Sequence, residues 1–255
     1  MKYATFHDLQ GQSVYITGGG SGIGADLTEG FLEQGCKVAF VQRSDATGFC
    51  DEMEQKHGNR PLFIQCDLTD VEALRASIAR TAAAHGDITV LVNNAANDKR
   101  HDLSPFEPAD WDQMQAINLR PHFFTAQAVA PGMKAAGGGS IINFSSISYM
   151  MGNGGYSAYV SAKAGITGLT RGLARELGPD KIRVNALMPG WVLTQKQLDQ
   201  WATPEGLAAH MDRQCLKEHL VPRDIVDGTL FLASNTSRMM TSQALVVDGG
   251  VVVTG

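Results

Sequence analysis

The sequence lacks several features that mark other classes of protein. No apolar run in its 255 residues approaches the roughly 18 residues that a membrane span requires. Its four cysteines are scattered without metal-type spacing, so we expect reduced thiols and neither a disulfide framework nor a metal site. The N-terminal stretch has no apolar core of a secretory signal, and we therefore expect a cytoplasmic protein with no membrane partner.

Basic residues are also in short supply. Lys and Arg number 21 against 26 Asp and Glu, which gives a net charge of −5. This balance argues against a nucleic-acid partner, because neutralising phosphates needs clustered cations. What the chain does have is 28 glycines and a 44% hydrophobic fraction. The apolar fraction is ample for a buried core, and the glycines indicate tight turns and close backbone approaches.

Short apolar runs alternate with amphipathic segments along the whole chain. The expected strands are Ser13–Thr17, Lys37–Gln42, Pro61–Cys66, Ile88–Val92, Ser140–Phe144, Arg183–Leu187 and Ala244–Val247. The expected helices cover residues 23–34, 45–57, 71–85, 110–135, 157–178 and 223–233. Such alternation predicts an α/β fold with βαβ crossovers: one doubly wound parallel sheet of about seven strands, with helices on both faces. No linker divides the chain, so we expect a single domain over residues 1–255.

Two stretches interrupt the alternation. Residues 190–220 are helix-like but contain no strand of their own, and Asn97–Asp110 is a polar loop after the fourth strand. Ligands of an open parallel sheet bind beyond the carboxyl ends of its strands, where both stretches would lie. We therefore expect a substrate lid near residues 190–220, with an ordinary surface excursion as the alternative.

A glycine-rich turn follows the first strand directly. It reads Thr17-Gly18-Gly19-Gly20-Ser21-Gly22-Ile23-Gly24 and leads into a helix. Glycines let the backbone approach a pyrophosphate, and the helix N-terminus supplies free N–H groups and a favourable dipole. The order strand, turn, helix favours a dinucleotide-binding turn over a merely flexible one.

The end of the second strand bears on which dinucleotide binds. An acidic residue about 20 positions beyond the glycines would hold the ribose hydroxyls of NAD. Gln42 stands there instead, and Arg43 follows it. An arginine at this edge can pair with the 2′-phosphate of NADP, although a solvated arginine would look the same in the sequence. The pattern favours NADP and leaves NAD open.

Tyr159 and Lys163 lie four residues apart in a predicted helix and so share one face. An ammonium group favours a neighbouring phenolate and lowers the pKa of the phenol, so the pair could exchange a proton with an alcohol or a carbonyl. Ser145 and Ser146 follow the strand that ends at Phe144. Ser146 precedes the tyrosine across a glycine-rich loop that could bring its hydroxyl to the same substrate oxygen.

Together these motifs resemble the short-chain dehydrogenase/reductase family over essentially the whole chain. The matching pieces, in order, are Thr17-Gly18…Gly22-Ile23-Gly24, Cys66-Asp67-Leu68, Asn93-Asn94-Ala95-Ala96, Asn118, Ser146, Tyr159…Lys163, Pro189-Gly190…Thr194 and Val247-Asp248-Gly249-Gly250. The resemblance implies a Rossmann sheet, an NADP or NAD cofactor and a homotetramer built partly from the helix after Asn118 and the Tyr159 helix. Ser21 stands where many NADP-dependent members carry a basic residue, which weakens the inference from Arg43.

The resemblance also implies a role for each site residue. Tyr159 would be the acid/base, and Lys163 would bind the nicotinamide ribose and depress the tyrosine pKa. Ser146 would position the reacting oxygen, and Asn118 would anchor a water that relays protons. The cofactor would be held by the turn residues Gly18, Ser21, Gly22, Ile23 and Gly24, by Arg43, Asp67, Leu68 and Asn94 at the adenosine end, and by Pro189, Gly190, Val192, Thr194, Tyr159 and Lys163 at the nicotinamide end.

Several stretches are similar to the sugar-oxidising branch of the family, the bacterial aldose 1-dehydrogenases. They are Asn97-Asp98-Lys99-Arg100-His101, Ala128-Val129-Ala130-Pro131-Gly132-Met133-Lys134 and Gln214-Cys215-Leu216-Lys217. A polyol needs many hydrogen-bonding groups. The side chains expected at the substrate are Asn97, Asp98, His101, Ser146, Ser148, Asn153, Tyr159 and Trp191. The implied reaction oxidises the anomeric hydroxyl of an aldose to a lactone.

Two other functions remain open at this stage. One is an NADPH-dependent reductase of a ketone or a 3-oxoacyl substrate, since Gly152-Asn153-Gly154-Gly155 also looks like ketoacyl reductases. Those would be expected to present a basic surface to a carrier protein, whereas this chain is acidic overall. The other is a non-catalytic dinucleotide sensor, because fold does not fix function. A sensor need not keep the base, yet every member of the implied catalytic set is present.

Overall fold

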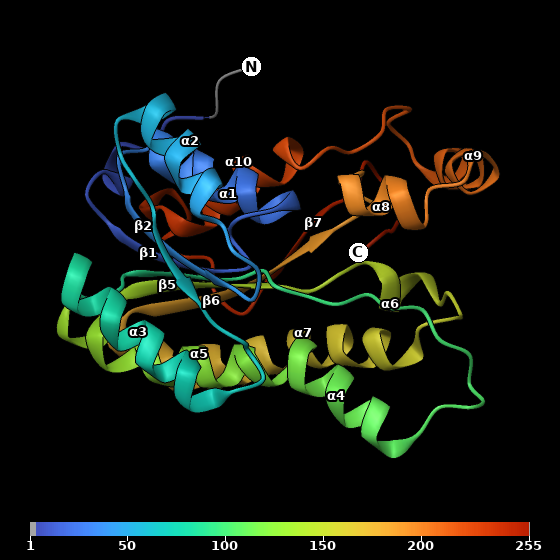
Figure 1. The fold of residues 1–255 in the computed structure, drawn as a ribbon, viewed down its shortest axis with the longest axis horizontal. Coiled ribbons are helices and arrows are strands. Elements are labelled where there is room, and N and C mark those ends of the chain that lie inside the picture. Colours follow the sequence, from blue (N-terminus) through green and yellow to red (C-terminus); the bar gives the residue numbers. More distant parts are fainter. Residues whose placement is uncertain (1–3, 255) are drawn as a thin grey trace.

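The computed structural model describes residues 4–254, which form a seven-stranded sheet with helices on both faces (Figure 1). The strands are β1 (Ser13–Thr17), β2 (Lys37–Gln42), β3 (Leu62–Gln65), β4 (Val90–Asn93), β5 (Gly139–Phe144), β6 (Ile182–Pro189) and β7 (Ala244–Val247). They run in the order β3-β2-β1-β4-β5-β6-β7, and every pairing is parallel. The predicted doubly wound parallel sheet is therefore confirmed.

The helices form two layers around this sheet. Their bounds are α1 (Gly22–Glu33), α2 (Thr47–His57), α3 (Val71–His85), α4 (Pro108–Asn118), α5 (Arg120–Ala135), α6 (Ser148–Met151), α7 (Ser157–Leu177), α8 (Gln195–Gln200), α9 (Pro204–Arg213) and α10 (Arg223–Ala233). Figure 1 shows α1, α2 and α10 above the sheet and α3, α5 and α7 below it. Helices α6, α8 and α9 gather at one end, beyond the strands.

Each helix layer has its own hydrophobic core. Phe31 of α1, Phe40 of β2 and Leu230 of α10 belong to one cluster, and all three are fully buried. Leu91 of β4 and Met133 of α5 belong to the other, on the opposite face. Central strands must therefore be apolar on both sides, and β1 is buried at every position. This double burial explains why the strands read as continuous apolar runs.

One expected helix is two helices. The segment predicted as a single helix over residues 110–135 breaks between α4 and α5 at Leu119, whose φ of −120° is not helical. Pro121 explains the break, because proline has no N–H to continue the hydrogen bonds of α4 but fits the first turn of α5. Residues 190–220 hold α8 and α9, and a lone parallel bridge between Val192 and Leu220 joins the two ends of this segment.

The sheet also fixes where a site can form. Strand order reverses between β1 and β4, and in register Thr17 pairs with Asn93, which pairs with Asn143. The carboxyl ends of β1, β4 and β5 therefore lie level, and the loops that follow them meet at one edge. Within residues 4–254, no helix combines the length and the apolarity needed to cross a lipid bilayer.

Candidate active site

A cavity of about 880 Å³ opens at the carboxyl edge of the sheet. The expected site residues that line it are Gly18, Ser21, Gly22, Ile23, Gly24, Asn94, Asp98, Ser146, Ser148, Asn153, Tyr159, Lys163, Pro189, Gly190, Trp191, Val192 and Thr194. The expected residues outside its lining are Arg43, Asp67, Leu68, Asn97, His101 and Asn118. Loops that are far apart in the sequence thus meet around one space large enough for a dinucleotide and a small substrate.

The glycine-rich turn forms one wall of this cavity. Gly18 and Gly22 adopt φ angles of +71° and +53°, which L side chains rarely adopt. A Cβ at Gly22 would lie 3.3 Å from Thr194 Cγ2, so glycine is what lets the turn approach the segment after β6. Ser21 stands at the N-cap of α1 but makes no side-chain cap, which leaves the first amides of the helix for an anion. These features fit the pyrophosphate of a dinucleotide.

Asn94 holds this turn against the end of β4. Its side-chain amide donates to the carbonyl oxygens of Thr17 and Gly18 at 3.1 and 3.0 Å. The Thr17 hydroxyl in turn accepts from the backbone N–H groups of Asn94 and Ala95. The strand ends are therefore locked together on either side of the point where a cofactor would enter.

The position expected to select the coenzyme is filled by a neutral side chain. Gln42 Oε1 accepts from Gly20 N at 2.9 Å, and its amide nitrogen donates to Ser44. Gln42 and Ser44 line the cavity, whereas Arg43 is exposed beside them. Arg43 also lies near enough to Asp67 to lower the pKa of that carboxyl, although the two hydrogen bonds from Thr69 are the main cause. The exposed Arg43 is therefore the accessible cation at the ends of β2 and β3, and the Asp67 carboxylate beside it already accepts hydrogen bonds from Thr69.

Tyr159 and Lys163 share the inner face of α7, as their spacing predicts. Lys163 Nζ lies 5.4 Å from the centroid of the Tyr159 ring and donates to the Phe144 carbonyl at 2.8 Å. The side chain of Lys163 is almost completely buried. Ser145 Oγ donates to the Lys163 carbonyl at 2.7 Å, so it supports the helix, while Ser146 lines the cavity. The expected triad of hydroxyl, phenol and ammonium is therefore assembled in one place.

The sequence predicts a lowered pKa for the Tyr159 phenol, but in the structure this pKa is raised. Burial raises the pKa of Tyr159, the Asp98 carboxylate raises it further, and a hydrogen bond with Ser146 opposes the rise. Burial also lowers the pKa of Lys163 to about 7, with Asp98 opposing. Desolvation is the largest cause of both shifts, and the attraction between the two groups that their spacing predicts is not among the causes. The lysine is poised near neutrality, and the tyrosine holds its proton more tightly than free phenol does.

Asn118 is buried and braces the loop after β4. Its side-chain carbonyl accepts from Asn97 N at 2.8 Å, and its amide donates to the carbonyls of Asn97 and Met114, each at 3.0 Å. Both amide hydrogens and one lone pair of the side chain are thus used in holding the backbone of Asn97 and Met114. The exposed Asn97 and the buried Asn118 act together as a structural clamp at the edge of the site.

His101 caps α7 instead of lining the cavity. Its Nδ1 lies 2.9 Å from the Asp102 carbonyl, and its Nε2 accepts from Ala158 N at 3.2 Å. The N-cap residue of α7 provides no side-chain cap, so His101 satisfies an amide that would otherwise be orphaned. The ring also stacks on Phe106 at 3.9 Å between centroids. The arrangement requires a proton on Nδ1 and a lone pair on Nε2.

Charged and polar contacts join the loop after β4 to the segment at residues 190–220. The Asp98 carboxylate pairs with Lys196 Nζ at 2.5 Å and accepts from Gln197 Nε2 at 2.7 Å. Gln197 also accepts from the Trp191 indole at 2.9 Å. All four side chains line the cavity. The expected lid is therefore fastened to the body of the site by one ion pair and a chain of hydrogen bonds.

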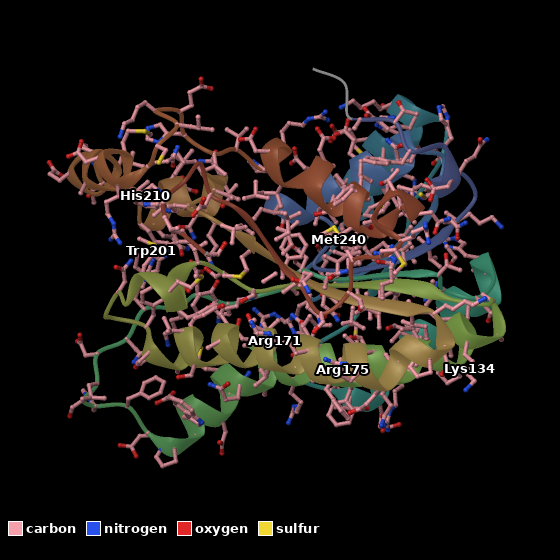
Figure 2. All side chains as sticks on the ribbon, turned by 180° about the vertical axis from the view of Figure 1, so that it is seen from behind. Lys134, Arg171, Arg175, Trp201, His210 and Met240 are labelled. Atoms are coloured by element: carbon pink, nitrogen blue, oxygen red, sulfur yellow. The ribbon has the colours of Figure 1, made fainter. Side chains whose placement is uncertain are left out.

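Three buried side-chain atoms in the cavity wall have no hydrogen-bond partner among residues 4–254. They are Ser148 Oγ, Trp201 Nε1 and His210 Nε2. Trp201 and His210 lie at the end of the molecule that carries α8 and α9 (Figure 2). Buried polar atoms are normally paired, so such atoms around one cavity indicate a polar ligand. A polar molecule bound in the cavity would supply partners for these three atoms.

Sequence reasoning singled out Ser148 but missed other parts of this wall. Arg100, Gln197, Trp201 and His210 line the cavity without having been proposed for the site. Arg100 stood inside the sugar-dehydrogenase-like stretch, which was a usable signal. Trp201 and His210 lay in the expected lid, but nothing in the sequence says which lid side chains turn inward.

We expect the substitution His101→Ala to destabilise the start of α7. Losing a helix cap costs about 1 kcal/mol, and this lowers the melting temperature of a domain of this size by about 2 to 4 °C. His101→Gln retains an acceptor and should recover part of the loss. Differential scanning calorimetry checks this, and an unchanged melting temperature in the alanine variant would contradict the capping role.

We expect Lys163 to make stability depend on pH in a defined window. Its pKa is about 7 when folded against an ordinary value of 10.5, so between these pH values the unfolded chain binds more protons. The penalty for the buried ammonium is therefore fully present below pH 7 and is relieved as the pH rises toward 10.5. Lys163→Met should be more stable than the native chain at pH 7, with the difference shrinking by pH 9. Urea titrations at both pH values test this; parallel pH profiles would refute it.

Comparisons with known proteins agree with this architecture. The family model described as enoyl-(acyl carrier protein) reductase matches residues 18–252. The probable galactose dehydrogenase GalD of Rhizobium meliloti is 49% identical over 248 residues, which cover 96% of this chain and 97% of that protein. The D-xylose 1-dehydrogenase of Caulobacter vibrioides is 47% identical over 251 residues, which cover 98% and 99%.

Solved structures agree as well. The structure of 7α-hydroxysteroid dehydrogenase complexed with NADH and 7-oxo glycochenodeoxycholic acid has a TM-score of 0.91 at 31% identity, and the match covers 96% of each chain. The region matched by the family model runs from the glycine-rich turn through the helix of Tyr159 to the last strand. We conclude that the chain belongs to the short-chain dehydrogenase/reductase family of oxidoreductases.

Proposed function

We propose that this protein is an NAD(P)-dependent aldose 1-dehydrogenase, which oxidises the anomeric hydroxyl of a sugar to a lactone. The observation that carries the proposal is that Ser148, Trp201 and His210, each with a buried polar atom unpartnered among residues 4–254, line the same cavity as Tyr159 and Lys163. A steroid or an acyl chain would leave those atoms unpaired, whereas a polyhydroxylated ring offers a donor or an acceptor to each. Relatives named as galactose and D-xylose dehydrogenases support the same substrate class.

The dinucleotide would lie along the glycine-rich wall. Gly18, Ser21, Gly22, Ile23 and Gly24 would hold its pyrophosphate through backbone amides. The adenosine end would meet Asp67, Leu68 and Asn94, and the nicotinamide end would meet Lys163, Pro189, Gly190, Val192 and Thr194. When bound, the oxidised cofactor supplies the acceptor for the hydride that leaves C1 of the sugar.

The protein's own part in the reaction is proton transfer and orientation. Tyr159 would accept the proton of the anomeric hydroxyl as the C1–O bond becomes a carbonyl, and Ser146 would hold that oxygen. Since burial raises the pKa of Tyr159, the phenol needs positive neighbours to act as a base. Arg100 lowers its pKa, and Lys163 Nζ lies 5.4 Å from the centroid of its ring. Asn118 would anchor a water that passes the proton on to solvent. The lactone product then hydrolyses to the aldonic acid.

The residues around 190–220 would form the lid over the substrate. Asp98 fastens this segment to the loop after β4 through Lys196 and Gln197. Among the expected substrate contacts, Ser148, Asn153 and Trp191 line the cavity, whereas Asn97 and His101 would act through the backbone and the helix cap. Closing such a segment excludes water from the hydride transfer.

We further propose a preference for NADP over NAD. Gln42 provides no carboxylate to bind two ribose hydroxyls and none to repel a 2′-phosphate. Arg43 is exposed beside it, where a guanidinium can form a charge-assisted fork with phosphate.

The protein would assemble as a homotetramer through α4, α5 and α7, where the exposed apolar side chains of Trp111 and Phe123 support an interface.

The substitution Tyr159→Phe should abolish turnover while leaving dinucleotide binding intact. Removing the proton acceptor costs about 10² to 10⁴ in kcat, the range for general acid–base catalysis. Cofactor affinity, followed by fluorescence titration, should stay within about twofold because the phenol contributes little to binding. Activity close to that of the native enzyme in this variant would refute the acid/base role.

A substrate panel tests the proposed reaction. We expect xylose, arabinose, galactose, fucose or rhamnose to be oxidised, with kcat/KM higher for NADP⁺ than for NAD⁺. Ketones and 3-oxoacyl thioesters, assayed with NADPH, should react poorly. If the enzyme turns over a thioester but no aldose, the aldose dehydrogenase proposal is wrong and the reductase alternative is correct.

The coenzyme preference has its own control. Arg43→Ala should reduce kcat/KM with NADP⁺ about 10-fold, as expected for one charged hydrogen-bonded contact, and leave the value with NAD⁺ unchanged. A strong NAD⁺ preference of the native enzyme would overturn the assignment of Arg43.

A further inference from the structure

A second cation in the cavity, Arg100, lies near the acid/base tyrosine and lowers the pKa of its phenol. Arg100, in the loop after β4, places its guanidinium carbon 3.8 Å from the centroid of the Tyr156 ring and 5.3 Å from that of Trp201. Arg100, Tyr156 and Trp201 all line the cavity. One ring belongs to the body of the site and the other to the segment at residues 190–220. The guanidinium therefore bridges the two parts that enclose the substrate.

This guanidinium has no hydrogen-bond or ion-pair partner in the described part of the chain. The one carboxylate that lines the cavity with it, Asp98, is already engaged by Lys196 and Gln197. Arginine stays protonated in proteins and presents five N–H donors in a fixed plane. The rings of Tyr156 and Trp201 lie close to the group and offset its charge, but rings do not satisfy in-plane donors. Those donors remain available to a ligand.

The position of Arg100 is fixed at the substrate end of the cavity. The next residue, His101, donates its backbone N–H to the Gly155 carbonyl at 2.9 Å and caps α7 at Ala158. Tyr156, on which Arg100 lies, stacks on Tyr159 with centroids 5.7 Å apart. The guanidinium is thus held one aromatic ring away from the catalytic phenol. It is preorganised and needs no rearrangement to meet a substrate.

A second unpaired donor accompanies it. Trp201 Nε1 is buried and has no partner among residues 4–254. The ring that stacks over Arg100 therefore also brings an N–H group into the same wall. Two neighbouring donor groups, one from each side of the cavity, match two neighbouring oxygens of a ligand.

We propose that Arg100 and Trp201 are specificity-determining residues that donate hydrogen bonds to an adjacent pair of hydroxyl oxygens on the sugar, away from the carbon that is oxidised. The inference rests on the proposed aldose dehydrogenase function and names the part of the substrate that is recognised. A neutral ring is favoured over a sugar acid because the two aromatic rings near Arg100 offset its charge and reduce its need for a counter-ion.

The test compares D-galactose with its 2-, 3-, 4- and 6-deoxy analogues in the native enzyme and in Arg100→Met. Methionine keeps apolar contact with both rings but has no donors. The native enzyme should discriminate about 10- to 100-fold in kcat/KM against the analogue or analogues that lack the recognised hydroxyls. In Arg100→Met the discrimination should fall to within about threefold, through a higher KM for galactose, with the KM for the dinucleotide unchanged.

Matched variants separate recognition from support of the lid. Trp201→Phe keeps the ring over Arg100 and removes only the N–H, so it should weaken discrimination without changing the melting temperature. Arg100→Lys retains the charge without the planar fork and should restore little of the discrimination. If Arg100→Met reduces kcat/KM by the same factor for galactose and every analogue, or raises the KM for the dinucleotide in parallel, Arg100 only holds the lid and the proposal is wrong.

Two further results have distinct meanings. Oxidation of D-galacturonate in preference to galactose, lost in Arg100→Met, would show that the guanidinium binds a carboxylate and would overturn the neutral-hydroxyl proposal. A native enzyme that oxidises no aldose would remove the proposed function and this inference with it. An active native enzyme without discrimination among the deoxy sugars would remove this inference alone.

Discussion

The burial of one ammonium group is the constraint around which the site is arranged. Lys163 reaches from α7 to the Phe144 carbonyl at the end of β5 and so joins a helix to the edge of the sheet where the loops converge. Its burial lowers its pKa to about 7, which makes its charge sensitive to whatever anion or dipole enters the cavity. Because isolated charges are costly to bury, the groups around Lys163 must be held in defined positions. The hydrogen bond from Ser145 Oγ to the Lys163 carbonyl is one contact that holds them.

The loop after β4 positions the other walls of the cavity. Asn118 holds its first part at Asn97, and His101 pins its later part to the first turn of α7. Between these anchors, Asp98 and Arg100 project toward the opposite wall and meet Lys196 and Trp201. A short stretch of polar residues therefore contacts both the start of α7 and the segment at residues 190–220, and links their positions.

The sequence was sufficient for the parts of this protein that depend on local chemistry. The sheet, the glycine-rich turn and the shared face of Tyr159 and Lys163 follow from periodicity and spacing, and the family resemblance follows from motifs in order. What could not be predicted depends on contacts across the fold. The break at Leu119 was not predicted because the apolar pattern continues through Pro121. The raised pKa of Tyr159 was not predicted because the spacing of residues does not reveal burial. That His101 faces a helix end and Trp201 faces the cavity are facts of tertiary packing.

The hydrogen bonds of Gln42 carry a consequence for how coenzyme choice evolves in this chain. The side chain accepts from the backbone of the glycine-rich turn and at the same time donates to Ser44. A carboxylate in its place could still accept from Gly20 but has no hydrogen to give, and would face the Ser44 carbonyl across a repulsive contact. An exchange toward the acidic residue typical of NAD sites would thus loosen the strand end that carries it. The Gln42 amide thus affects both the choice of coenzyme and the rigidity of the end of β2. Neither property can be altered without a compensating change in its neighbours.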